Sequence, residues 1–255
     1  MKNNGQASDF LYVHTKSAEK YAVTSGINFS EFAATIPTDL QHILLLQHQV
    51  EFPSFHFSTH FDYLMKEDFP LLFQESDKRM DFSWIDFEDL VGLDELSGEE
   101  VAELLYLSHM KKPLHGPFFN RLNNHYMYLS YHEGLITQTY YRDFNDFYSM
   151  LSGVVVNKLF AQKSEKKLFS KKSVEVAPIP IDLLKLIEER LNEGVVFSIL
   201  NSTVSRGKVQ IPFWTIGDYQ DMNEMRDEYV KLAKQDPSGM LLYDRREKEW
   251  HLFLT

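Results

Sequence analysis

The chain has 255 residues, of which 44% are hydrophobic and 14% aromatic, and 26 Lys and Arg against 37 Asp and Glu give a net charge of −11. This apolar content can cover a sizeable core, which excludes a mainly disordered chain. The sequence contains no cysteine, so disulfides, thiolate metal sites and cysteine nucleophiles are excluded as well.

The charge is distributed unevenly along the chain. Residues 1–157 carry 10 basic and 22 acidic side chains, whereas residues 158–255 carry 16 basic and 15 acidic ones. An acidic surface repels a phosphate backbone, so nucleic acid is not an expected partner. The polar first nine residues do not form a signal peptide, and no apolar run approaches the ~18 residues that span a bilayer. We therefore expect a cytoplasmic protein that does not enter a membrane.

The N-terminal third is predicted to begin with a strand over residues 10–14. Leu40, Ile43 and Leu44 recur at helical spacing and predict a helix that starts near residue 38 and ends before Pro53. A second helix is predicted from a cap at Thr59 through residue 65.

Residues 81–103 hold nine acidic side chains and no basic one. Their first part, in which carboxylates alternate with large apolar residues, is predicted to be a loop. Ser97 and Glu100 then have the spacing of a capping box, which predicts a helix from residue 98 to about residue 111.

The clearest local pattern is a hairpin, with strands over 124–131 and 135–142 around a turn that contains Gly134. A helix with apolar residues at helical spacing is predicted to follow Asp143. Residues 163–173 hold five lysines and are predicted to be a linker. The residues after this linker predict a helix, two strands, a further helix and a closing hairpin.

Antiparallel hairpins mixed with amphipathic helices predict an α+β protein of two lobes, residues 1–162 and 174–255. A helix followed by a hairpin occurs more than once, without a repeat of residues.

Sequence motifs for common enzymes are missing. No pair of glycines is two, four or five residues apart, so the dinucleotide-binding, nucleophile-elbow and P-loop patterns are absent, as is His-Glu-x-x-His. This weakens nucleotide-binding and hydrolase functions but leaves open an enzyme whose site assembles from distant residues.

The one pair of histidines with metal-ligand spacing is His56 and His60, which would share a face if they lay on a helix. A metal site needs three or four ligands, and histidines among many phenylalanines are more often ordinary surface or partly buried residues. We therefore expect neither a metal nor another cofactor.

Two further segments offer candidate binding residues. The acidic segment combines carboxylates with aromatic anchors and is a candidate docking site for a basic protein surface; its residues are Trp84, Asp86, Phe87, Glu88 and Asp89. The alternatives are a solvated acidic loop and a cluster for acid–base or cation chemistry. The hairpin offers a candidate ligand-binding face formed by Tyr126, Tyr128, His132 and Arg142, against the alternative of an ordinary sheet with tyrosines at its margin.

The function predicted from these patterns is binding or regulation through protein–protein contacts. The alternative is a hydrolase-like enzyme with a His/carboxylate site, with or without a metal ion. The sequence assigns no catalytic residue and does not decide between the two.

Overall fold

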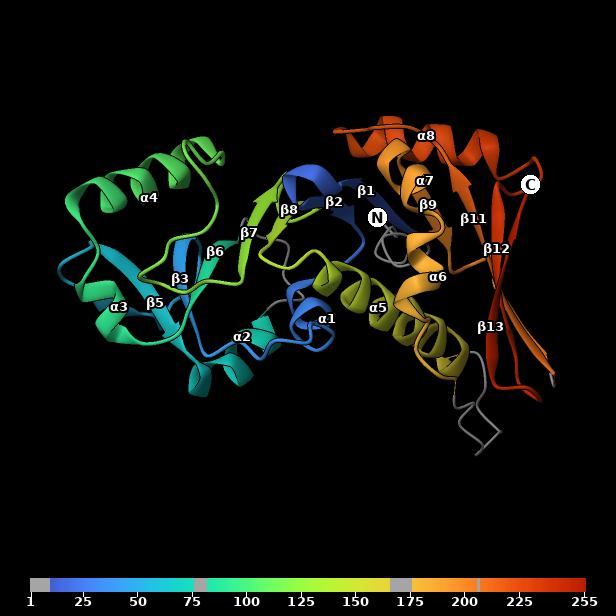
Figure 1. Cartoon of the computed structure of the whole chain (residues 1–255), viewed down its shortest axis with the longest axis horizontal. Coiled ribbons are helices and arrows are strands. Elements are labelled where there is room, and N and C mark those ends of the chain that lie inside the picture. The colour runs from blue at the N-terminus through green and yellow to red at the C-terminus, as the bar shows by residue number, and fades with distance from the viewer. Residues whose placement is uncertain (1–9, 76–81, 166–175, 206) are drawn as a thin grey trace, which may run out of the picture. The chain divides into compact units, whose positions relative to one another are not determined.

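The structure is a computed structural model, and it describes residues 10–75, 82–165, 176–205 and 207–255 (Figure 1). Helices are mixed with antiparallel strands along these residues, so the predicted α+β class is confirmed. Contacts divide the chain into two compact units. Unit 1 combines Met1–Ser17, Thr24–Ile27 and Phe147–Thr255, and unit 2 combines Ala18–Val23 and Asn28–Asp146.

Unit 1 is built on strands in the order β13-β12-β11-β9-β1, with the short β10 also paired to β11. Helix α8 packs on one face of this sheet, where its Met225 contacts the cluster of Phe10, Tyr12, Val196 and Trp214. The elements are β1 (Phe10–Lys16), α5 (Asn145–Glu165), α6 (Ile181–Lys185), α7 (Glu188–Glu193), β9 (Val195–Ser198), β10 (Thr203–Val204), β11 (Lys208–Thr215), α8 (Met222–Leu232), β12 (Gly239–Asp244) and β13 (Glu249–Leu254).

Unit 2 has the strand order β8-β7-β6-β3-β5-β4, with β2 beside β8. Helix α4 packs on one face through Leu104 and Leu107, and helix α1 packs on the other face through Phe29 and Phe32. The elements are a 3₁₀ turn η1 (Ser17–Glu19), β2 (Tyr21–Ser25), α1 (Phe29–Ala33), β3 (His42–Gln47), β4 (Ser54–His56), β5 (Phe61–Met65), a 3₁₀ turn η2 (Lys66–Asp68), α2 (Phe69–Glu75), β6 (Ser83–Phe87), α3 (Leu90–Asp94), α4 (Gly98–Met110), β7 (Tyr126–Tyr131) and β8 (Ile136–Tyr141).

The two units share one arrangement of strands. In unit 1, β9 pairs with β11, helix α8 follows, and the hairpin β12–β13 adds to β11. In unit 2, β3 pairs with β6, helices α3 and α4 follow, and the hairpin β7–β8 adds to β6. The helix-then-hairpin order of the sequence therefore belongs to a longer repeated arrangement of strand, strand, helix and hairpin.

Several local predictions are confirmed by the structure. Strands β7 and β8 form the predicted hairpin. The Ser97 side chain accepts the Glu100 N–H, and the Glu100 carboxylate accepts the Ser97 N–H, so the capping box at the start of α4 is present. The closing hairpin of the chain is formed by β12 and β13.

The two helices predicted between residues 38 and 65 are wrong, because these residues form β3 and β5. Ile43, Leu44, Leu45 and Leu46 are all buried, since both faces of β3 are covered. A strand buried on both faces has a continuous apolar run, which lacks the alternation of a half-exposed strand and matches helical spacing by chance.

The predicted loop in the acidic segment is also wrong, because residues 83–87 form the central strand β6. Its alternate residues contact different helices: Ile85 and Phe87 lie in the cluster with α4, while Trp84 contacts Phe29 and Phe32 of α1. The single charged residue of this strand, Asp86, is buried with the rest.

The predicted linker falls largely on residues outside the described ones. Its first three residues, 163–165, continue helix α5, which ends at Glu165. The contact-based units differ from the linear division at 163–173: strand β1 and helix α5 belong to unit 1 together with the C-terminal elements.

Candidate functional site

The five residues predicted as a docking segment are divided between the core and the surface. Trp84, Asp86 and Phe87 are buried in β6, so they cannot contact a partner in the folded protein. Glu88 and Asp89 are exposed. Asp89 caps helix α3 by accepting the Gly92 N–H at 2.9 Å. Only these two carboxylates of the proposed docking segment are accessible.

Asp86 has a structural environment that explains its burial. Its carboxylate accepts the backbone N–H of His125 at 2.9 and 3.0 Å and the N–H of Tyr126 at 2.6 Å. The side chain thus bonds the N–H groups at the beginning of β7, next to the paired residues Ile85 of β6 and Met127 of β7. Burial raises the pKa of Asp86 to about 7, although these N–H groups and the charge of Arg142 act in the opposite direction.

Arg142, from the predicted ligand face, organises the same region. Its Nε donates to the Asn124 carbonyl oxygen at 2.7 Å, and its guanidinium lies 5.4 Å from the centre of the Phe118 ring. Asn124 in turn accepts the Phe119 N–H at 2.8 Å. These bonds hold the segment before β7 in place and leave Arg142 half-buried.

The two tyrosines of that predicted face do project from the same side of β7, but the side is covered. Tyr126 and Tyr128 both contact Phe32 of α1, with ring centres 5.7 and 5.4 Å away. Tyr128 also stacks on Trp84 at 5.3 Å, and the Tyr126 hydroxyl donates to Asp146 at 2.9 Å. His132, by contrast, is exposed in the hairpin turn. The four residues therefore do not form an open ligand face.

The histidines of the predicted metal pair do not lie on a helix. His56 ends β4, and His60 lies in the following turn with a φ of 60°. The Nε2 of His56 lies 3.2 Å from the Asp94 carboxylate and its Nδ1 lies 3.0 Å from the Thr59 hydroxyl, so both ring nitrogens have partners within the protein. Because a carboxylate only accepts, the His56 ring donates from Nε2 to Asp94.

The order carboxylate, imidazole and hydroxyl in Asp94, His56 and Thr59 is that of a nucleophilic triad. Thr59, however, is only 1% exposed, so a substrate cannot reach its hydroxyl. No hydrogen bond between described residues joins His56 to Asp86 or to the hairpin histidines His125 and His132. The set fixes the β4–β5 turn on helix α3 and does not form the His/carboxylate site that the sequence left open.

In unit 1, a buried histidine also pairs with a carboxylate. His14 of β1 is 2% exposed, with Nδ1 3.2 Å from Asp218 and Nε2 3.1 Å from the carbonyl oxygen of Asn192. Thr15 donates to the Asn192 side chain at 2.6 Å. Burial lowers the pKa of His14, and the attraction of Asp218 only partly opposes this effect.

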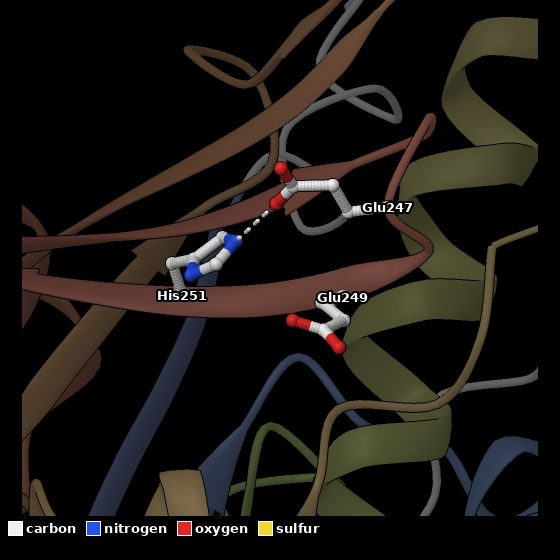
Figure 2. Close-up of side chains that lie close together, drawn as sticks. All are labelled: Glu247, Glu249 and His251. Carbon is white, nitrogen blue, oxygen red and sulfur yellow. Dashed lines mark ion pairs between the residues drawn. The ribbon is translucent and has the colours of Figure 1, made fainter.

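One group of three ligand-type side chains occurs among the residues that the structure describes. It consists of Glu247, Glu249 and His251 at the β12–β13 hairpin, whose ligand atoms all lie within 4.8 Å of one another (Figure 2). His251 Nε2 and Glu247 Oε2 are 3.6 Å apart. Both glutamates are exposed; Glu247 lies in the turn between the strands, and Glu249 and His251 lie on β13. The geometry is that of a surface ion pair with a neighbouring carboxylate.

Among the described residues, the most exposed phenylalanine lies on the β4–β5 hairpin of unit 2. Phe57 is 82% exposed and Phe55 46% exposed, and their rings meet edge to face at 5.3 Å. The turn that carries them is fixed by the His56–Asp94 pair, and helix α3, which provides Asp94, also exposes Val91. We call Phe55 and Phe57 the Phe55–Phe57 surface.

Sequence reasoning did not single out this surface. A usable pattern was present, because four phenylalanines at positions 52, 55, 57 and 61 alternate with polar residues. Two phenylalanines separated by one residue share a face of an extended chain, and a short edge hairpin cannot bury both of its faces.

No protein-family model, no curated protein and no solved structure matches this chain. In the described part of the chain, every helix is too short or too polar to cross a lipid bilayer.

Proposed function

We propose that this protein acts by binding another protein, and that unit 2 presents the Phe55–Phe57 surface to a basic segment of the partner. The observation that carries the proposal is the 82% exposure of Phe57 on a turn that is fixed in position. A large aromatic side chain held in water on an ordered turn is typical of a contact residue, because burying it contributes ~1.5–3 kcal/mol to association.

The charge of unit 2 supports a basic partner. Its residues include 21 Asp and Glu against eight Lys and Arg, a net charge of −13, whereas unit 1 has 18 basic against 16 acidic residues. Like-signed charge at this density attracts a basic surface over several ångströms and speeds its association. Asp94, whose side chain is 67% exposed, provides one of these carboxylates and pairs with His56 of the same hairpin. Nucleic acid is disfavoured by the same charge, and a cytoplasmic location is part of the proposal.

The enzyme alternative has less support. Its best geometry is the Asp94, His56 and Thr59 set, in which the hydroxyl is inaccessible. The buried Asp86 bonds backbone N–H groups, which is a structural use of a carboxylate.

The experiment compares partner binding by the wild type, by Phe57→Ser and by a control variant, Leu186→Ser. Leu186 is 68% exposed in unit 1, so both substitutions remove an exposed apolar side chain without disturbing a core. Proteins captured from a lysate by the wild type are identified, and the binding of each purified candidate is then measured at low and high salt. We expect Phe57→Ser to weaken binding of a basic partner roughly tenfold or more, and salt to slow its association. Equal binding by wild type and Phe57→Ser would show that this surface is not the docking site.

A further inference from the structure

Strand β13 is an open edge of the sheet in unit 1. It is the outermost strand next to β12 (Figure 1), and no strand formed by the described residues pairs with its other side. All six of its residues, Glu249–Leu254, pair with β12 in one unbroken register. An edge strand of this length presents a row of N–H and C=O groups that another strand can bind.

The backbone groups that face outward can be identified from the register. The Thr255 N–H donates to the Ser238 carbonyl oxygen at 3.2 Å, which places the backbone groups of Thr255 toward β12. Because these groups alternate along an antiparallel strand, those of Trp250, Leu252 and Leu254 face away from β12. The open edge therefore has three hydrogen-bonding positions, symmetric about Leu252.

The side chains of β13 do not protect this edge. Phe253 and Leu254 are 52% and 50% exposed, and the strand contains no proline, lysine or bulge. Proteins commonly protect open edges with such residues or with very short strands. The edge strand of unit 2, β4, is an example: it has three residues and follows Pro53.

The repeated arrangement indicates what belongs at this position. In unit 2 the strand equivalent to β13 is β8, and its outer side is occupied by β2. The Tyr141 N–H at the end of β8 donates to the Lys20 carbonyl oxygen at 2.9 Å. The equivalent position in unit 1 holds no strand among the described residues.

We propose that β13 of a second copy of the chain occupies this position, antiparallel and related by a two-fold axis at Leu252. Such pairing places Trp250 opposite Leu254 of the second copy and Leu252 opposite Leu252, so that all outward-facing backbone groups meet partners. Phe253 lies opposite His251, and the two exposed Glu249 side chains lie outside the apolar centre. Charge also permits this pairing, because unit 1 carries a net charge of only +2 and two copies of it repel each other little.

The first test measures the mass of the full chain by sedimentation velocity across roughly 1–100 µM. We expect a wild-type dimer whose fraction rises with concentration. Leu252→Pro removes an outward-facing N–H without removing a bond to β12, and Leu252→Lys places two like charges at the axis; both variants are expected to be monomers. Leu252→Ala keeps the N–H and is the matched control, expected to remain a dimer. A wild type that is monomeric throughout, or dimers that persist in both the Pro and Lys variants, would overturn the proposal.

The second test examines the register. Because the chain has no cysteine, Leu252→Cys introduces a single thiol. Two copies of residue 252 at the axis would be about 5.5 Å apart at Cα, within the range of a disulfide. We expect mild oxidation to link Leu252→Cys into a covalent dimer much faster than Phe57→Cys, whose site is more exposed but distant from β13 in sequence and sheet. Equal rates for the two variants would contradict the pairing, and neither test depends on the Phe55–Phe57 surface.

Discussion

The Asp86 carboxylate accepts the Tyr126 backbone N–H at 2.6 Å, across a sequence separation of 40 residues. A side chain on β6 therefore positions the first residue of β7. Replacing Asp86 by Asn keeps the size of the side chain but weakens its acceptance of the N–H groups. We expect Asp86→Asn to lower the free energy of unfolding by about 1–3 kcal/mol, measured by urea denaturation at a pH well below 7. A variant as stable as the wild type would show that the N–H groups find other acceptors.

The same carboxyl group predicts a pH dependence. Its pKa is about 7 in the folded protein and about 3.9 in an unfolded chain, so the folded state binds its proton more tightly. Its contribution to stability is therefore complete below about pH 4 and is lost as the pH rises toward 7. The unfolding free energies of the wild type and of Asp86→Asn are measured from pH 4 to pH 8. As the pH rises, the wild type should lose stability relative to Asp86→Asn. A difference that is constant with pH would contradict the raised pKa.

His14 predicts a pH dependence of stability with the opposite sign. Burial lowers its pKa in the folded state, so the unfolded chain binds the proton more tightly. The neutral ring is then stabilising above about pH 6.5, and stability is lost as the pH falls below that value. His14→Gln cannot titrate, and it should show a smaller loss of unfolding free energy than the wild type between pH 7.5 and pH 5. The comparison is made within each protein, because the substitution itself also changes packing. Identical pH profiles for the two proteins would contradict the prediction.

Removing the capping box of α4 is predicted to lower the free energy of unfolding moderately. Ser97 and Glu100 bond each other's backbone N–H groups at 3.2 and 2.8 Å, and Glu100 also pairs with Arg121. Ser97→Ala removes one acceptor and should cost about 1 kcal/mol of unfolding free energy. Ser108→Ala is the control, since Ser108 lies near the exposed end of the same helix and is not a cap. Equal losses in the two variants would mean that the cap does not stabilise α4.

Replacing Gly194 is predicted to lower the free energy of unfolding strongly. It has a φ of 98°, and a Cβ atom there would lie 2.0 Å from the Gly217 carbonyl oxygen. Gly194→Ala should therefore lose more than about 2 kcal/mol, because backbone strain adds to a clash with backbone atoms. Gly116→Ala is the matched control, because a Cβ atom at Gly116 would have no other atom within 4 Å. This variant is expected to change the melting temperature little. A small effect at Gly194 would show that the α7–β9 junction can shift.

Local features of the fold could be predicted from the sequence where a few neighbouring residues determine them. The β7–β8 hairpin and the Ser97 capping box depend on turn and cap residues that lie within ten positions of one another. The strands β3 and β6 could not be predicted in the same way. The burial of both strands depends on elements distant in sequence, such as helices α1 and α4 on the two faces of β6, and nothing in the local sequence specifies that cover.

The candidate site shows the same dependence on distant contacts. Trp84 and Phe87 lie in an acidic segment that is typical of a docking site, but both side chains are buried in the core. Phe55 and Phe57 lie in a segment rich in phenylalanine that is typical of a core, but both side chains are exposed to water. Which aromatic residues are covered follows from the strand order, in which β6 is central and β4 is an edge. Asp94 reaches His56 only because α3 packs beside the β4–β5 turn, a relationship that spans 38 residues of sequence.

The stacking of Trp84 on Tyr128 gives unit 2 its own optical signal. Trp84 is the one tryptophan of unit 2, and Trp214 and Trp250 both belong to unit 1. In a protein with Phe at positions 214 and 250, indole emission would come from a fully buried ring in contact with tyrosine, and its red shift on unfolding would report unit 2 alone. Emission from a Trp84→Phe protein would report unit 1. The order in which the two units lose structure can therefore be followed in the intact chain, without separating them.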